Sequence, residues 1–175
     1  KPNFIDLASK KFGSSTIIVA IEASKFLNGK YYALTDNGRE ETNKEVVQWA
    51  KEVEQRGAGE ILLTSIDNEG TGDGFDIELS NLVSKAVKIP VIAHGGAGKY
   101  EDVKKILSST KIDGVAISSL FHYSSIKKIK NNYINSIEGN TEFINSYKDF
   151  KNFGKYNLTE LKNFLVKNKI QTRTI

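Results

Sequence analysis

Short, unbroken runs of apolar residues recur along the chain, and polar segments separate them. Each run consists mainly of Ile, Val, Leu and Ala, without the polar alternation of a strand that has one face in water. Continuous apolar runs of this length are typical of parallel strands that are covered on both faces. We therefore expect buried parallel strands at residues 16–21, 61–65, 91–93 and 114–117.

Segments with helical periodicity lie between and around these runs. Their apolar residues recur at spacings of three and four, as on a helix with one buried face. Thr42 and Glu45 have the spacing of a capping box, Asp76 is a candidate N-cap, and Thr159 with Lys162 forms a weaker pair. The predicted helices are residues 2–13, 42–56, 76–88, 99–109 and 159–168.

This alternation of strands and helices predicts an α/β fold with a parallel sheet. Periodicity alone leaves open whether the sheet is doubly wound or closed into a barrel. Two segments interrupt the alternation. Residues 30–35, followed by Asp36-Asn37-Gly38, indicate a hairpin after the first strand, and residues 124–156 read as a partly helical insertion. We expect residues 1–175 to form a single domain that contains this insertion.

Composition limits the classes of function. Apolar residues make up 39% and charged residues 26% of the chain, as in globular proteins. The net charge is +4 with lysines spread throughout, which favours anionic small molecules over nucleic acid. The absence of Cys excludes disulfides, zinc–thiolate sites and thiol nucleophiles. We expect a cytoplasmic protein without a membrane span, metal or cofactor. Because helical periodicity begins at once after Lys1, with no Met and no signal peptide, we also expect the chain to begin in the middle of a fold.

Polar residues cluster where the first two predicted strands end, which is where parallel α/β folds bind ligands. Glu22 follows the first strand and is a candidate general acid or base, or else an acid that pairs with Lys25. The second strand ends in Thr64-Ser65-Ile66-Asp67-Asn68-Glu69-Gly70-Thr71-Gly72. Its hydroxyls and carboxylates suit ligand binding and proton transfer, although a polar turn has the same composition.

The last two predicted strands end in residues suited to binding an anion. His94-Gly95-Gly96-Ala97-Gly98 precedes a predicted helix, so its backbone N–H groups can surround an anion at the helix N-terminus. Ser118 and Ser119 end the fourth strand, and phosphate commonly binds after the last strands of a barrel. His94 is an acid–base candidate, a phosphate donor or a hydrogen-bonded neighbour.

Several of these motifs resemble the C-terminal half of the cyclase subunit of imidazole glycerol phosphate synthases. They are Ile-Val-Ala-Ile-Glu-Ala (18–23), Arg-Gly-Ala-Gly-Glu-Ile-Leu-Leu-Thr-Ser-Ile-Asp (56–67), Pro-Val-Ile-Ala-His-Gly-Gly-Ala-Gly-Lys (90–99) and Ser-Ser-Leu-Phe-His (118–122). The resemblance covers residues 1–123 and resumes at residues 158–175. It implies a TIM-type (β/α)8 barrel of two similar halves, of which this chain is the C-terminal half-barrel, strands 5 to 8, with an insertion before the last helix. The N-terminal half-barrel is then a missing partner.

The resemblance also implies a reaction in histidine biosynthesis. A glutaminase subunit supplies ammonia, and the cyclase cleaves a phosphorylated, phosphoribosyl-type substrate and closes an imidazole ring. Glu22 and Glu69 then stand at the places of catalytic acids, and Glu60 stands near the ammonia entrance. The substrate or phosphate would contact Thr64, Ser65, Gly70, His94, Gly95, Gly96, Ser118 and Ser119. A further catalytic Asp belongs to the half that this chain lacks.

Three departures from the family pattern keep one alternative open, and the missing half-barrel keeps open a second. Glu stands at positions 22 and 69 where the family has Asp, His94 stands where it has a small Ser, and the insertion at 124–156 is atypical. These features are similar to a paralogous group that supplies ammonia for acetamidino modification of surface sugars on O-antigen or flagellin. The other alternative is a non-catalytic, phosphate-binding half-barrel fragment.

Overall fold

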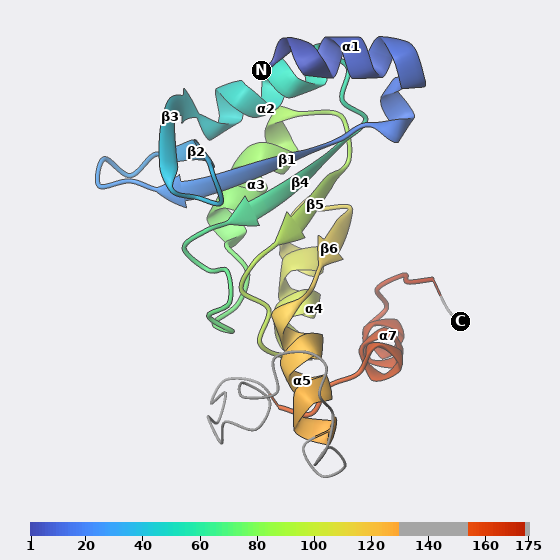
Figure 1. Ribbon diagram of the computed structural model, residues 1–175. Coiled ribbons are helices and arrows are strands. Elements are labelled where there is room, and N and C mark those ends of the chain that lie inside the picture. Colours follow the sequence, from blue (N-terminus) through green and yellow to red (C-terminus); the bar gives the residue numbers. More distant parts are fainter. Residues whose placement is uncertain (130–153, 174–175) are drawn as a thin grey trace, which may run out of the picture.

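Helices and strands alternate around one sheet in the computed structural model, which describes residues 1–129 and 154–173 (Figure 1). A 3-10 turn (Ser14–Thr16) joins the first helix to the first strand. The strands are β1 (Ile18–Lys25), β2 (Tyr31–Thr35), β3 (Glu40–Glu45), β4 (Glu60–Ser65), β5 (Val91–His94) and β6 (Gly114–Ala116). The helices are α1 (Asn3–Phe12), α2 (Val46–Gln55), α3 (Ile77–Ala86), α4 (Tyr100–Ser109), α5 (Ser119–Ile129) and α7 (Leu158–Lys167).

The sheet has six strands in the order β3-β2-β1-β4-β5-β6. Strands β1, β4, β5 and β6 are parallel, which confirms the four predicted strands, whereas β2 and β3 add an antiparallel extension. Within the described residues the sheet is open, with β3 and β6 as its end strands. The α/β class is as predicted, and the parallel strand–helix units are consistent with the TIM-barrel family.

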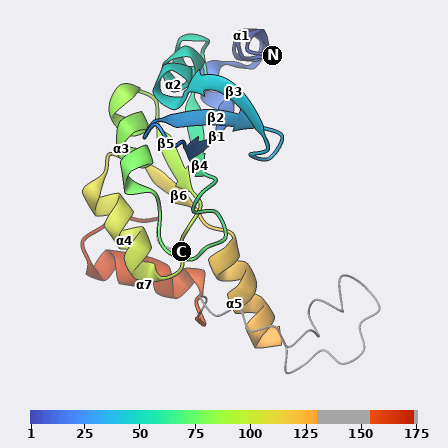
Figure 2. The ribbon, with the colours of Figure 1, turned by 90° about the vertical axis from the view of Figure 1, so that its left-hand side faces the viewer.

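The two faces of the parallel sheet have different surroundings. Helices α2, α3 and α4 lie along one face (Figure 2), where Ile21, Ile61 and Leu63 are buried. On the other face Ile18 is 55% exposed and Leu62 is half-buried. The prediction of strands covered on both faces therefore holds for only one face of the described chain.

The predicted hairpin is confirmed, but its second strand corrects the helix that we placed at residues 42–56. Asp36, Asn37 and Gly38 form the turn with positive φ angles of 53°, 56° and 76°. Thr42 then lies in β3, where its hydroxyl donates to the carbonyl of Ala33, so it does not cap a helix. The helix begins only at Val46. Strand β3 is an end strand whose residues are exposed or half-buried, so it lacks alternating apolar residues. Its sequence therefore did not indicate a strand.

Two other helix starts were predicted with different success. Asp76 is the N-cap of α3, because its Oδ1 accepts a hydrogen bond of 2.9 Å from the N–H of Leu79. The last helix, in contrast, is capped by Asn157, whose Oδ1 accepts from the N–H of Glu160 at 2.8 Å. The expected cap at Thr159 is therefore wrong by two positions.

Helix α5 runs into the segment predicted as an insertion, and residues 130–153 of that segment lie outside the described residues. The two described ends of the segment meet at Ser124, which is fully buried. Its Oγ donates to the carbonyl of Gly154 at 2.8 Å and accepts from the N–H of Tyr156 at 3.1 Å. Gly154 and Tyr156 therefore lie beside Ser124 of α5. Among the helices of the described chain, none has the length and apolar character needed to cross a membrane.

Candidate substrate-binding site

A small pocket lies at the carboxyl ends of β4, β5 and β6, where the sequence placed the ligand site. The loop after β4, the glycine loop after β5 and the residues that lead from β6 into α5 line it. The lining residues are Glu69, Gly70, Gly72, His94, Gly95, Gly96, Ala97, Ala116, Ile117, Ser118 and Ser119.

The two loops that form the pocket pack against each other without space for side chains between them. The N–H of Gly74 donates to the carbonyl of Gly96 at 2.7 Å, and the side-chain amide of Asn68 donates to the carbonyl of Gly74 at 2.8 Å. A Cβ atom on Gly96 would lie 2.1 Å from the Gly74 oxygen, and its φ of 101° also favours glycine. Gly96 is therefore required by the packing of the loops, in addition to any contact with a ligand.

The pocket offers neutral hydrogen-bond donors to an anion. The N–H groups of Phe121 and His122 make the first bonds of α5 to the Ser118 carbonyl, so the amides of Ser119 and Leu120 precede the first helical bond. They point out of the N-terminus of an 11-residue helix, next to the backbone of the glycine loop. No Lys or Arg is among the described residues that line this pocket. The arrangement suits an oxyanion held by amides and hydroxyls.

Glu22, Thr64 and His94 form one row across the sheet. Glu22 is in register with Thr64, Thr64 with His94, and His94 with Ala116 at the edge of the pocket. Because register partners in a sheet project to the same side, all these side chains face the surface that the helices leave open. The Thr64 Oγ1 and the His94 Nδ1 are 3.1 Å apart, and Thr64 is 7% exposed.

The remaining predicted residues lie apart from this row. Ser65 lies on the opposite side of β4, where its Oγ donates to the Oδ1 of Asn68 at 3.3 Å. Glu69 and Gly70 are exposed in the pocket wall. Glu60 is at the other end of β4, in register with Ile18. The structure thus brings Glu69, Gly70, His94, Gly95, Gly96, Ser118 and Ser119 into one pocket, places Glu22 and Thr64 beside it, and leaves Glu60 at the far end of the sheet.

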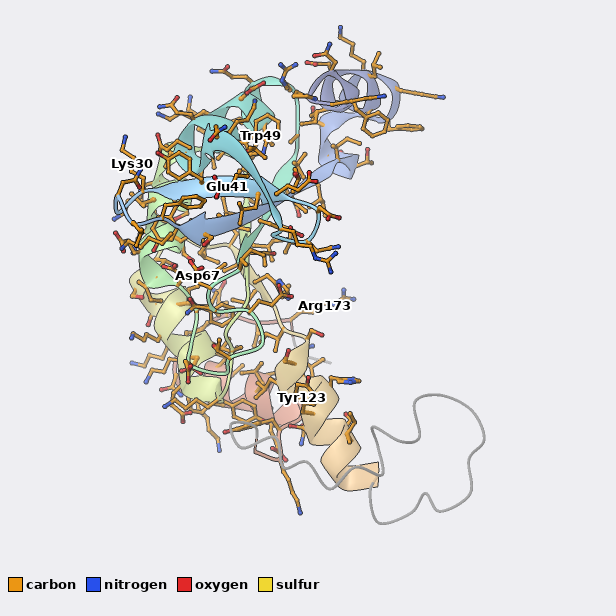
Figure 3. All side chains as sticks on the ribbon, turned by 60° about the vertical axis from the view of Figure 1, so that its left-hand side comes forward. Lys30, Glu41, Trp49, Asp67, Tyr123 and Arg173 are labelled. Carbon is orange, nitrogen blue, oxygen red and sulfur yellow. The ribbon has the colours of Figure 1, made fainter. Side chains whose placement is uncertain are left out.

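Two loop residues have structural roles that the sequence did not reveal. Asp67, considered for proton transfer and labelled in Figure 3, accepts from the Ser24 hydroxyl at 2.6 Å and from the N–H of Lys25 at 2.8 Å. It therefore joins the ends of β1 and β4. Asn68 braces the β4 loop internally, because its side-chain amide donates to the carbonyl of Gly74 in the same loop. A polar residue in a glycine-rich turn gives no sequence signal for such a bridge.

Comparisons with known proteins match the part of the chain that contains this pocket. A family model described as "Histidine biosynthesis protein" matches residues 1–127. The chain is also 50% identical over 131 residues to the imidazole glycerol phosphate synthase subunit HisF of Campylobacter concisus (strain 13826). That match covers 74% of this chain and 51% of the relative, so the chain spans about half the length of the curated relative. The matched residues include every strand of the sheet and the whole pocket.

Proposed function

Because the chain belongs to the histidine biosynthesis protein family, we propose that it forms the pocket-bearing half of a cyclase subunit of the imidazole glycerol phosphate synthase type. Such a subunit uses ammonia from a glutaminase partner to cleave a phosphoribosyl-type substrate and close an imidazole ring. The observation that carries the proposal is the family match over residues 1–127, which contain the complete pocket.

One phosphate of the substrate would occupy the pocket. Gly95, Gly96, Ser118 and Ser119 line it, and we propose that their backbone amides and hydroxyls bind the phosphate. These groups are fixed before a ligand arrives, because the Gly96 carbonyl accepts from the N–H of Gly74 and the Ser118 carbonyl accepts the first hydrogen bonds of α5. Preorganised amides at a helix N-terminus favour the phosphate charge without a basic side chain.

The reacting part of the substrate would extend from this phosphate over the row of Glu22 and Thr64. Glu22 is half-buried on the open face and is the proposed proton-transfer group. Glu69, in the pocket wall, is the second candidate acid, and Ser65 supports the loop that carries it. Glu60 stands at the opposite end of the same sheet face, where we propose that ammonia enters.

We further propose that a second half-barrel covers the open sheet face and supplies the remaining catalytic group. Four parallel strands do not close a barrel, and the half-exposed apolar side chains on that face are suited to such a contact. On this proposal the 175-residue chain alone is inactive.

The test supplies the chain in trans with the half of the C. concisus relative that it does not match. With ammonium as the nitrogen source, the pair should form the imidazole product, and Glu22→Gln should reduce turnover by roughly two to four orders of magnitude. Glu40→Gln, an exposed change on the edge strand β3, serves as the matched control. Undiminished turnover with Glu22→Gln would remove Glu22 from the mechanism. A pair that binds phosphate but has no activity would favour a phosphate-binding scaffold.

A second candidate is ammonia supply for amidino modification of a sugar, and the imidazole of His94 in the catalytic row favours it. His94 lies within hydrogen-bonding distance of Thr64, and Thr64 is in register with Glu22 on the next strand. The variant Glu22→Asp separates the two functions. A histidine-pathway cyclase should keep or gain imidazole-forming turnover with the shorter acid. A sugar-modifying protein should show no such turnover with either residue, and its amidination activity should depend on Glu22.

A further inference from the structure

The hydroxyl of Thr64 has one partner among the described residues, and that partner is a ring nitrogen of His94. The Thr64 side chain is 7% exposed, so water does not readily take the place of this partner. A buried hydroxyl is stabilised when its proton has an acceptor. The nitrogen within reach is the His94 Nδ1, at 3.1 Å from the Thr64 Oγ1.

This contact determines which ring nitrogen carries the proton when His94 is neutral. If the Thr64 hydroxyl donates to Nδ1, then Nδ1 is unprotonated and the proton is on Nε2. The opposite tautomer would leave the Thr64 hydroxyl proton buried without an acceptor in the described chain. Nε2 itself has no hydrogen-bond partner among the described residues, and His94 lines the pocket next to Gly95 and Gly96.

We infer that Thr64 is a positioning residue that fixes the Nε2–H tautomer of His94, and that this N–H donates to an oxygen of a phosphate monoester in the pocket. The inference deepens the proposed function, because it rests on the proposed phosphate site and adds a residue that selects the ligand. It assigns His94 the role of a neutral, directional donor, alongside the amides and hydroxyls of Gly96, Ser118 and Ser119.

The composition of the pocket explains why a fixed tautomer matters there. The described lining contains no Lys or Arg, and the acidic residue Glu69 is part of it. A phosphate must therefore be recognised through correctly aimed hydrogen bonds instead of through excess positive charge. If the imidazole presented a bare nitrogen to the pocket, its lone pair would repel the phosphate oxygen.

The first experiment reads the tautomer directly. Nitrogen-15 NMR of histidine-labelled chain at pH 8 should show a protonated Nε2 and an unprotonated Nδ1 for His94. The chain has two histidines, and the variant His122→Gln assigns the signals. In Thr64→Val the two His94 nitrogen shifts should move toward each other, as expected for mixed tautomers, and Thr64→Ser should restore the separation. A merely structural threonine would not move these signals.

The second experiment measures binding of inorganic phosphate by titration of the same samples. Glutamine places its amide donor near the position of Nε2, whereas asparagine places it near Nδ1, so His94→Gln and His94→Asn form a matched pair. His94→Gln should keep the affinity, while His94→Asn and Thr64→Val should weaken it roughly three- to tenfold, the usual worth of one hydrogen bond. Thr64→Ser should again match the parent.

The outcomes separate this inference from the proposed function. Equal phosphate affinity in the parent, His94→Asn and Thr64→Val would overturn the inference and leave the phosphate site intact. A parent His94 with its proton on Nδ1 would also overturn it. No phosphate binding by the parent would overturn both the phosphate site and the inference, and the split-cyclase assay would then decide separately whether the catalytic function stands.

Discussion

At the scale of single residues, Tyr31 connects the hairpin to the loop that carries the site. Its side chain is 4% exposed, and its hydroxyl donates to the Oδ2 of Asp76 at 2.9 Å. The other oxygen of Asp76 caps α3, so one carboxylate joins β2 to the helix that follows the pocket loop. Burial raises the pKa of Tyr31 well above its ordinary value, and the hydrogen bond to Asp76 raises it further.

Replacing Tyr31 with Phe should lower the free energy of unfolding by about 1 kcal/mol at pH 7, because a buried hydrogen bond is lost. The raised pKa also predicts a pH dependence. The protonated Tyr31 contributes fully to the free energy of unfolding below the tyrosine pKa of the unfolded chain, about 10. This contribution is lost as the pH rises above that value. Denaturant titrations from pH 7 to pH 11 should show a steeper alkaline loss in the parent than in Tyr31→Phe.

The control for this prediction is Tyr32→Phe. The Tyr32 hydroxyl accepts an exposed hydrogen bond from Asn28, so its loss should change stability little. If the free energy of unfolding fell with rising pH equally steeply in the parent, Tyr31→Phe and Tyr32→Phe, the contact of Tyr31 with Asp76 would not contribute to stability.

The sequence predicted which residues follow each strand, but not which partners their side chains contact. Glu22 and Asp67 both follow an apolar run, yet only Glu22 lies in the row beside the pocket. Asp67 accepts hydrogen bonds from Ser24 and Lys25, which precede it by more than 40 positions. The register between β1 and β4 brings these residues together. The glycine loop was predictable because positive φ angles and close backbone approach require that residue type.

At the scale of elements, the buried hydroxyl of Ser124 holds together the two ends of the predicted insertion. It bonds to Gly154 and Tyr156, while the Tyr100 hydroxyl accepts from the N–H of Asn157 at 2.8 Å. Helix α5 therefore has its first residues in the pocket and Ser124 at this junction. The sequence predicted an insertion from its composition, but a single serine in a helix gives no sign of contacts 30 positions away.

Replacing Ser124 with Ala should cost about 1 kcal/mol of stability, because the Gly154 carbonyl and the Tyr156 N–H both lose the hydroxyl that joins them to α5. Ser125→Ala is the matched control, since Ser125 is the next residue of the same helix and is exposed. Chemical denaturation measures the difference between the two variants. A Ser124→Ala protein as stable as Ser125→Ala would show that the junction is held by other contacts.

The strands were predicted more accurately than the elements around them, for a physical reason. Buried strands must be apolar, so their sequences identify them, whereas β3 is an end strand held by main-chain pairing to β2. Its residues are polar, and Thr42 and Glu45 within it also have the spacing of a helix capping box, which led us to predict a helix there. Edge strands depend on neighbours that a local pattern does not contain.

At the scale of the whole molecule, apolar side chains remain exposed on surfaces that a globular protein normally covers. Ile18 is 55% exposed on the open face of the sheet, and Phe4, Leu7 and Phe12 of α1 are 68%, 66% and 61% exposed. These apolar side chains and the open edge of β6 are features suited to contact with another folded unit. This agrees with the proposal that a second half-barrel completes the fold.

We therefore predict that the 175-residue chain self-associates, and that the complementary half of the relative converts it into a one-to-one complex. Ile18→Glu should weaken self-association by about tenfold or more, because a charge replaces an apolar side chain that association removes from water. Leu27→Glu should have no such effect: Leu27 is fully exposed in the loop between β1 and β2, away from the open face. Sedimentation velocity over a concentration series distinguishes these outcomes. A dilute, stable monomer with a cooperative melt, unchanged by Ile18→Glu, would mean that the open face needs no partner and that the half-barrel proposal is wrong.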